Sequence, residues 1–186
     1  SSLTSLILPA GLERIGYHVF YGCTNLEYIV IPSSVSWVGS FTFYNCSKLQ
    51  SIDIPKGIEN IGDKFFYNCS KLTSVDIPKN VESIGQYAFY GCSGLTGITI
   101  PEGVTSIGSS AFADCSSLSS LEIGNSVTSI GDSAFDECTS LTMVTIPDNV
   151  TSLGNYVFSN CDNLKSVIIG DGVTNIGERA FSYCYE

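Results

Sequence analysis

The chain has 186 residues, of which 44% are apolar and only 14% are charged, and its formal net charge is −10. An acidic excess of this size repels phosphate groups, which disfavours nucleic acids and anionic membrane surfaces as partners. No stretch approaches the ~20 consecutive apolar residues of a membrane-spanning helix, so we expect no membrane insertion. The chain opens directly on repeat sequence at Leu3, and we interpret it as a mature form or a fragment.

A period of 23 residues organises the sequence, because four residue types return at this spacing in eight copies. The cysteine column is Cys23, Cys46, Cys69, Cys92, Cys115, Cys138, Cys161 and Cys184, and Leu3, Gly16 and Phe20 begin the other three columns. The units are 3–25, 26–48, 49–71, 72–94, 95–117, 118–140, 141–163 and 164–186. Such a period is typical of a solenoid, so we predict one domain over residues 1–186.

The first element of each unit is predicted to be a short strand. In the unit 72–94, Val75 and Ile77 alternate with the polar Asp76, which is the period of a half-buried strand. Pro78 then ends the strand, because proline has no N–H to donate to a neighbouring strand.

A return segment and a glycine follow the strand. Val81 and Ile84 are predicted to point into the core from this segment, which can hold a second short strand. Gly85 belongs to the glycine column, which indicates a backbone position that tolerates no Cβ. Two causes are open for this column, a positive φ or close stacking of neighbouring units.

The last element of each unit is predicted to be a helical or 3-10 turn. Ala88, Phe89 and Cys92 have the spacing of one helical turn that faces the core. One unit cannot bury its apolar face alone, but stacked units turn each inward column into a continuous ladder. We therefore expect a strand ladder on one face of the solenoid and short helical or 3-10 turns on the other.

The repeat resembles the BspA-like leucine-rich repeats, also called the Treponema pallidum type. The resemblance rests on the blocks L-x-x-I-x-I-P, V-x-x-I-G and A-F-x-x-C, with Gly124 and Gly170 in place of the proline in two units. It implies a right-handed leucine-rich-repeat solenoid in a secreted or surface-anchored protein. It also implies a role in adhesion to host matrix proteins or other cells, with no shared catalytic motif.

The eight cysteines are predicted to be buried free thiols. Residues in one column of a stack lie ~4.8 Å apart, whereas the Cβ atoms of a disulfide lie ~3.8 Å apart. Some disulfide bonding is the alternative. A ladder of thiols does not converge on a point, so we expect no metal ion and no cofactor. His18, the single histidine, lies in a variable column and is interpreted as an exposed loop residue, which disfavours an enzyme.

A run of four tyrosines is the first candidate binding site. It follows the core phenylalanine of four successive units and consists of Tyr21, Tyr44, Tyr67 and Tyr90. Exposed rigid aromatic side chains are favoured at binding surfaces and could stack on sugar rings or pack on a protein. The alternative is that the tyrosines shield the phenylalanine ladder.

The outward positions of the strands are the rival site, where Tyr28, Asp53, Asp76 and Glu122 stand among short side chains. Such a smooth face suits an extended or flat partner better than a small molecule. We therefore predict a secreted or cell-surface binding module for a protein, matrix or glycan ligand. The alternative is a structural spacer, or a scaffold that assembles end to end because its terminal repeats carry no polar cap.

Overall fold

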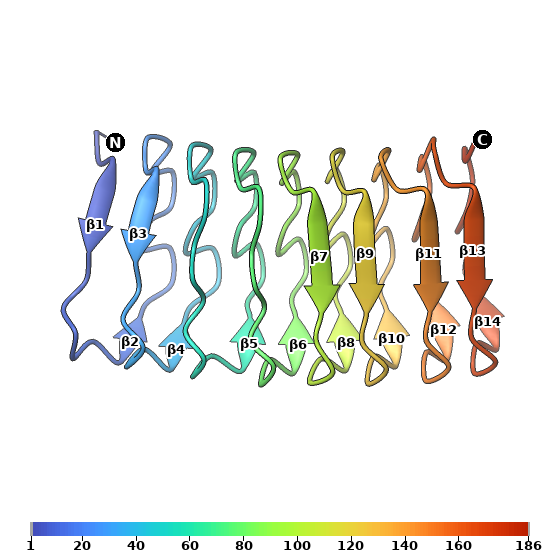
Figure 1. Ribbon diagram of the computed structural model, residues 1–186, viewed down its shortest axis with the longest axis horizontal. Coiled ribbons are helices and arrows are strands. Elements are labelled where there is room, and N and C mark those ends of the chain that lie inside the picture. The colour runs from blue at the N-terminus through green and yellow to red at the C-terminus, as the bar shows by residue number, and fades with distance from the viewer. Residues whose placement is uncertain (1, 186) are drawn as a thin grey trace.

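The computed structural model describes residues 2–185, in which every regular element is a β-strand. The chain coils through one continuous stack from the N-terminal to the C-terminal end, and the coil is right-handed (Figure 1). Ser1 and Glu186, at the ends of the predicted domain, lie outside the described residues. The predicted leucine-rich-repeat solenoid is confirmed at the level of a strand-rich, parallel β-solenoid.

The first segment of each unit, which is a strand in six of the eight units, forms the front of the solenoid in Figure 1. The strands are β1 (Ser5–Ile7), β3 (Tyr28–Val30), β7 (Gly97–Ile100), β9 (Ser120–Ile123), β11 (Met143–Ile146) and β13 (Ser166–Ile169). We call this side, with residues 51–54 and 74–77 between β3 and β7, the strand face. Its strands pair in parallel as β1–β3, β7–β9 and β11–β13, and an isolated bridge joins Asp53 to Asp76. The ladder is therefore interrupted after every second unit.

The return segment forms the second ladder, at the back of the solenoid. Its two-residue strands are β2 (Arg14–Ile15), β4 (Trp37–Val38), β5 (Asn60–Ile61), β6 (Ser83–Ile84), β8 (Ser106–Ile107), β10 (Ser129–Ile130), β12 (Ser152–Leu153) and β14 (Asn175–Ile176). This ladder runs without a break from β5 to β14, and β2 pairs with β4. The second short strand is thus present in every unit, and the second residue of each strand points into the core except at the C-terminal end.

The predicted helical or 3-10 turns are wrong, because the described residues contain neither kind of helix. The segment around Phe89 is a series of turns whose alternate N–H groups donate to the next unit. Tyr87 N donates to Ser109 O at 3.0 Å, and Phe89 N donates to Ala111 O at 2.7 Å. Tyr87 itself has a φ of 56°, which no right-handed helix contains. Stacking thus takes the donors that a helix would need, while Phe89 and Cys92 still face the core.

The glycine column is explained by close stacking. A Cβ on Gly108 would lie 2.6 Å from the carbonyl carbon of Gly85, and one on Gly154 would lie 2.5 Å from that of Gly131. These glycines do not have a positive φ, so the packing distance between units, and not the turn, excludes a side chain. The same close packing stacks the core rings, with 4.9 Å between the centroids of Phe89 and Phe112.

Candidate binding surfaces

The four predicted tyrosines form a continuous stack in the turns that follow the return strands. The ring centroids of Tyr21 and Tyr44 are 4.5 Å apart, those of Tyr44 and Tyr67 are 4.6 Å apart, and those of Tyr67 and Tyr90 are 4.8 Å apart. The planes of neighbouring rings differ by 0°, 8° and 11°. The faces of the inner rings therefore cover one another, and only edges and hydroxyl groups are left for a partner.

The two pKa shifts in this stack have local causes. Partial burial raises the pKa of Tyr44, and the neighbouring hydroxyls of Tyr21 and Tyr67 add to the effect. A hydrogen bond to the carboxylate of Asp114 raises the pKa of Tyr90 to about 12, with a further contribution from burial. Both tyrosines thus remain neutral hydrogen-bonding groups at physiological pH.

A second row of side chains lies beside the tyrosine stack, in the column that we interpreted as freely variable. His18 stacks on Phe41 at 4.7 Å, and the Lys64 ammonium lies 5.2 Å from the ring of Phe41 and 5.3 Å from that of Tyr87. His18 is exposed as predicted, but it is part of this row. This row and the tyrosine stack together form a wide aromatic surface on the N-terminal half of the solenoid. The aromatic residues that cluster in these units are the sequence feature that indicates it.

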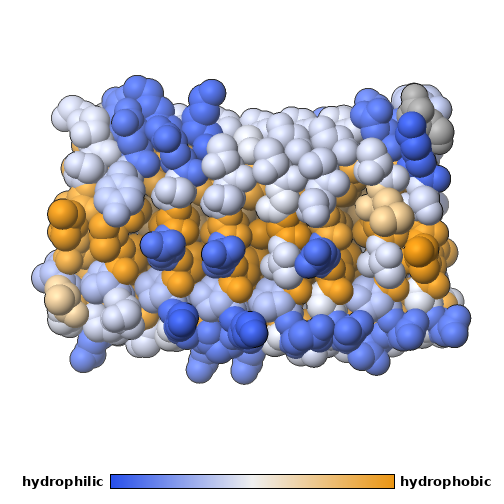
Figure 2. Space-filling view, in the orientation of Figure 1, coloured by the Kyte–Doolittle hydropathy of each residue, from blue (hydrophilic) through white to orange (hydrophobic). Residues whose placement is uncertain are grey.

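The strand face carries all four of the rival residues. Tyr28, Asp53, Asp76 and Glu122 are exposed on it, and Tyr28 keeps 54% of its surface. Asp53 and Asp76 are neighbours through the isolated bridge. The hydroxyl of Thr99 donates to Oε2 of Glu122 at 3.2 Å, which holds this carboxylate over the adjacent strand. In Figure 2 an apolar band crosses this face, and single hydrophilic side chains stand out from it.

Hollows on the strand face coincide with the interruptions of its ladder. A hollow of about 410 Å³ lies between residues 74–79 and β7, one of about 350 Å³ lies between β9 and β11, and one of about 60 Å³ lies between β3 and residues 51–53. These hollows could not be predicted from the sequence, because the pairing of strands alternates from unit to unit although the repeat is regular. The largest reaches the low end of the ~300–1,000 Å³ range of ligand sites.

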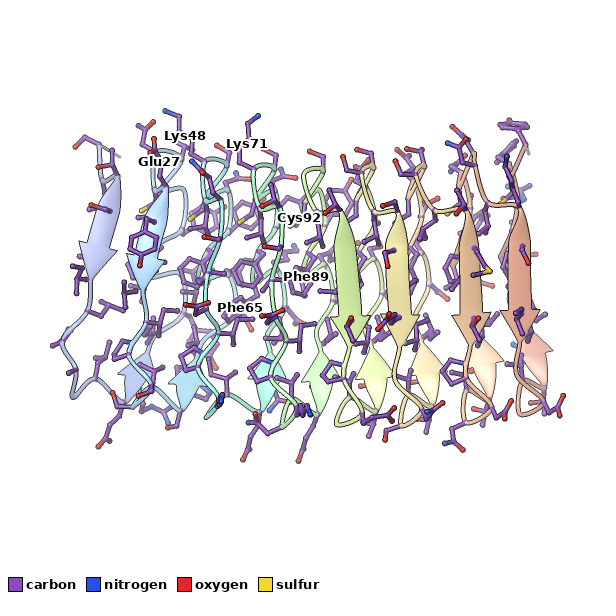
Figure 3. All side chains as sticks on the ribbon, viewed as in Figure 1. Glu27, Lys48, Phe65, Lys71, Phe89 and Cys92 are labelled. Carbon is purple, nitrogen blue, oxygen red and sulfur yellow. The ribbon has the colours of Figure 1, made fainter. Side chains whose placement is uncertain are left out.

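The upper edge of the strand face is lined by charged side chains. Figure 3 shows Glu27, Lys48 and Lys71 extending from the turns at this edge, whereas Phe65 and Phe89 lie inside the coil. The first three, with Gln50 and Thr73, line a shallow hollow of about 390 Å³. Lys48 and Lys71 make this edge locally basic, whereas the strand face beside it carries the carboxylates of Asp53, Asp76 and Glu122.

The cysteine ladder lies in the core and consists of eight free thiols. Each Sγ from Cys46 onward lies 3.2–3.4 Å from the carbonyl oxygen of a phenylalanine, as in the contact of Cys92 with Phe66. Burial raises the pKa of these thiols, to about 12 for Cys46. Cys23 and Cys184 are only partly buried, so the prediction that all eight are buried is wrong at the two ends of the solenoid.

No metal centre or membrane-spanning element is found in the described part of the chain. Within residues 2–185, no group of three or more histidine, cysteine, aspartate or glutamate residues could hold a metal ion. The same residues include no helix that is long and apolar enough to cross a membrane.

Comparison with known proteins agrees with the repeat architecture. Residues 1–93 and 59–186 match the family described as the BspA type leucine-rich repeat region. This chain belongs to the BspA-type leucine-rich-repeat family. No curated protein matches it at a significant level.

Several solved structures share its fold. A leucine-rich-repeat protein of T. pallidum is 30% identical, with a TM-score of 0.80 over 88% of this chain and 79% of that one. A leucine-rich cell surface protein from Faecalibacterium prausnitzii is 29% identical, with a TM-score of 0.70 over 98% of this chain and 59% of that one. The pneumococcal vaccine antigen PcpA shares the fold at 23% identity and a TM-score of 0.60, over 100% of this chain and 56% of that one.

Proposed function

We propose that this chain is a non-catalytic, protein-binding repeat module of a secreted or cell-surface protein and that its strand face binds the partner. The cell-surface description of the Faecalibacterium relative supports the location. The BspA-type family supports the module, since solenoids of stacked repeats offer extended surfaces for recognition.

The exposure of large apolar side chains on the strand face carries this proposal. Tyr28, Met143 and Ile168 keep 54%, 58% and 55% of their surfaces exposed, although the other residues of their columns are mostly small or polar. The unit folds without them, because Ser51, Ser74 and Ser120 fill the position of Tyr28 and Met143 in other units. Met143 and Ile168 lie on the paired strands β11 and β13, and exposed apolar side chains that gather on neighbouring strands mark interaction surfaces.

The tyrosine stack is the less favoured of the two candidate sites. Its rings contact one another at 4.5–4.8 Å, so much of their area is already buried within the chain. Its inner rings cannot receive a sugar ring on their faces, and a partner would contact only edges and hydroxyl groups. Packing of the tyrosines over the core accounts for the stack without a ligand.

The test is a binding screen against purified extracellular-matrix proteins and a glycan array. For a protein that binds along the strand face, the double variant Y28S/M143S should weaken the affinity at least about tenfold, as expected for the loss of two large contact side chains. The matched control Y44S/Y67S also introduces the serines that the chain itself has in that column, at Ser159 and Ser182. Loss of binding in the control alone would move the site to the tyrosine stack, and binding of glycans only would contradict a protein partner.

A second candidate function is end-to-end assembly into a scaffold. β13 and β14 have open edges at the C-terminal end, where Ile169 and Ile176 keep 38% and 48% of their surfaces exposed. These residues occupy positions that are buried between neighbouring units elsewhere, as Ile146 and Leu153 are. Sedimentation velocity over a hundredfold range of concentration tests it. Association that I176K abolishes supports the scaffold, and a monomer at every concentration excludes it.

A further inference from the structure

We propose that the hollow above Gly97 on the strand face receives the cationic side chain of an arginine or lysine from an extended segment of the partner protein. This inference rests on the proposed function, because it assigns one position of the same binding face. It starts from a glycine that the fold does not require.

Gly97 occupies a strand position where every other unit has a side chain. Its φ is not positive, and a Cβ added to it would meet the Cβ of Ser120 at 3.5 Å, which is an ordinary van der Waals contact. By contrast, a Cβ on Gly108 would lie 2.6 Å from backbone atoms. A glycine inside a strand weakens it and often marks a place where a ligand or another backbone approaches closely. Gly97 therefore serves neither the turn nor the stacking of units.

The missing side chain leaves room for a hollow on the strand face. The hollow has a volume of about 410 Å³ and is lined by Ser74 and Asp76 on one side of Gly97 and by Ser120 on the other. It lies at the interruption between residues 74–77 and β7, so the pairing of strands does not close it. Serine hydroxyls and open backbone groups at its wall suit hydrogen bonds to a polar or charged ligand.

The charges around the hollow favour a cation. The carboxylate of Asp76 lines the hollow, and that of Glu122 is held over the neighbouring strand by its hydrogen bond from Thr99. Lys79 also lines the hollow, so its wall carries one carboxylate and one ammonium group, and Glu122 beside the hollow makes the surrounding charge negative. A long cationic side chain could place its head group near Asp76 and Glu122 and its methylene groups over Gly97.

The test uses a fluorescein-labelled nonapeptide in which glycine and arginine alternate, with matched peptides that have glutamine, glutamate or leucine in place of arginine. Binding to the whole chain is measured by fluorescence anisotropy at low and at physiological ionic strength. We expect the arginine peptide alone to bind. The variant G97M, which copies Met143 of the same column, should weaken binding at least about tenfold, and D76N should weaken it about two- to fivefold.

The control D162N removes one charge from an exposed turn of the unit 141–163, two units along the solenoid from Gly97, and should leave the affinity unchanged. Thermal unfolding of G97M verifies that the variant folds. Binding that G97M leaves intact, or that D162N lowers as much as D76N does, would show attraction to the net charge and overturn the proposal. Binding of the leucine peptide, or of no peptide, would overturn it as well. If the Y28S/M143S variant still loses its protein partner in that case, the proposed function stands and only the cation site fails.

Discussion

Phe112 lies at the middle of the phenylalanine ladder, and its replacement by alanine tests whether stability depends on contacts between neighbouring units. The ring is fully buried between those of Phe89 and Phe135, at centroid distances of 4.9 and 5.3 Å. Truncation of such a buried phenylalanine costs about 3–5 kcal/mol. Phe181 has one ring neighbour in this ladder, Phe158 at 5.7 Å, and is only partly buried. We expect F181A to lower the free energy of unfolding by roughly half as much as F112A, because Phe181 stacks on one neighbouring ring and Phe112 stacks on two.

Urea unfolding followed by circular dichroism measures both variants against the parent chain. The free energy of unfolding should fall more for F112A than for F181A, and the slope of the transition should also change if the central break uncouples the two halves. Equal losses at the two sites would refute the nearest-neighbour reasoning.

Three further outcomes are expected. A thiol reagent at neutral pH should react only with Cys23 and Cys184 until denaturant is added, because the other thiols are buried and their pKa values are raised; fast reaction of more than two thiols would contradict this packing. G108A should lower the free energy of unfolding by more than about 2 kcal/mol, because its Cβ meets the backbone of the preceding unit, and an unchanged urea midpoint would show that the units can separate. The raised pKa of Tyr90 stabilises the fold below pH 10, and this contribution should be lost as the pH rises from 10 to about 12. D114N should lower the pKa of Tyr90 in a titration followed by tyrosinate absorbance. An unchanged pKa would show that Asp114 is not the cause of the shift.

The solenoid and its core could be predicted because each inward residue is repeated in register. Val75, Ile77 and Phe89 face the core as their columns indicate. The prediction of a helical turn is wrong because the spacing of Ala88, Phe89 and Cys92 fits a series of turns equally well. The missed signal lies just before each cysteine, in the column Gly22, Asn45, Asn68, Gly91, Asp114, Glu137, Asn160 and Tyr183, all of which have positive φ. Glycine, asparagine and aspartate are the residues that adopt this conformation most readily.

The candidate surfaces could be predicted in position but not in detail. The tyrosine column and the strand-face residues lie where the repeat places them. Whether Tyr44 presents a face or an edge depends on its side-chain rotamer, and stacking on Tyr21 and Tyr67 decides that. The hollow above Gly97 depends on an interruption of strand pairing, which an otherwise regular repeat does not encode.

Photo-crosslinking can show whether the partner protein contacts the strand face. Benzoylphenylalanine would replace Ser74 on the strand face in one sample and Tyr44 of the tyrosine stack in another, and each would be irradiated with a matrix protein that the screen identifies. Both positions are at least partly exposed, so either can accept the probe. We expect a crosslinked complex from position 74 and none from position 44. A complex from position 44 alone would contradict it.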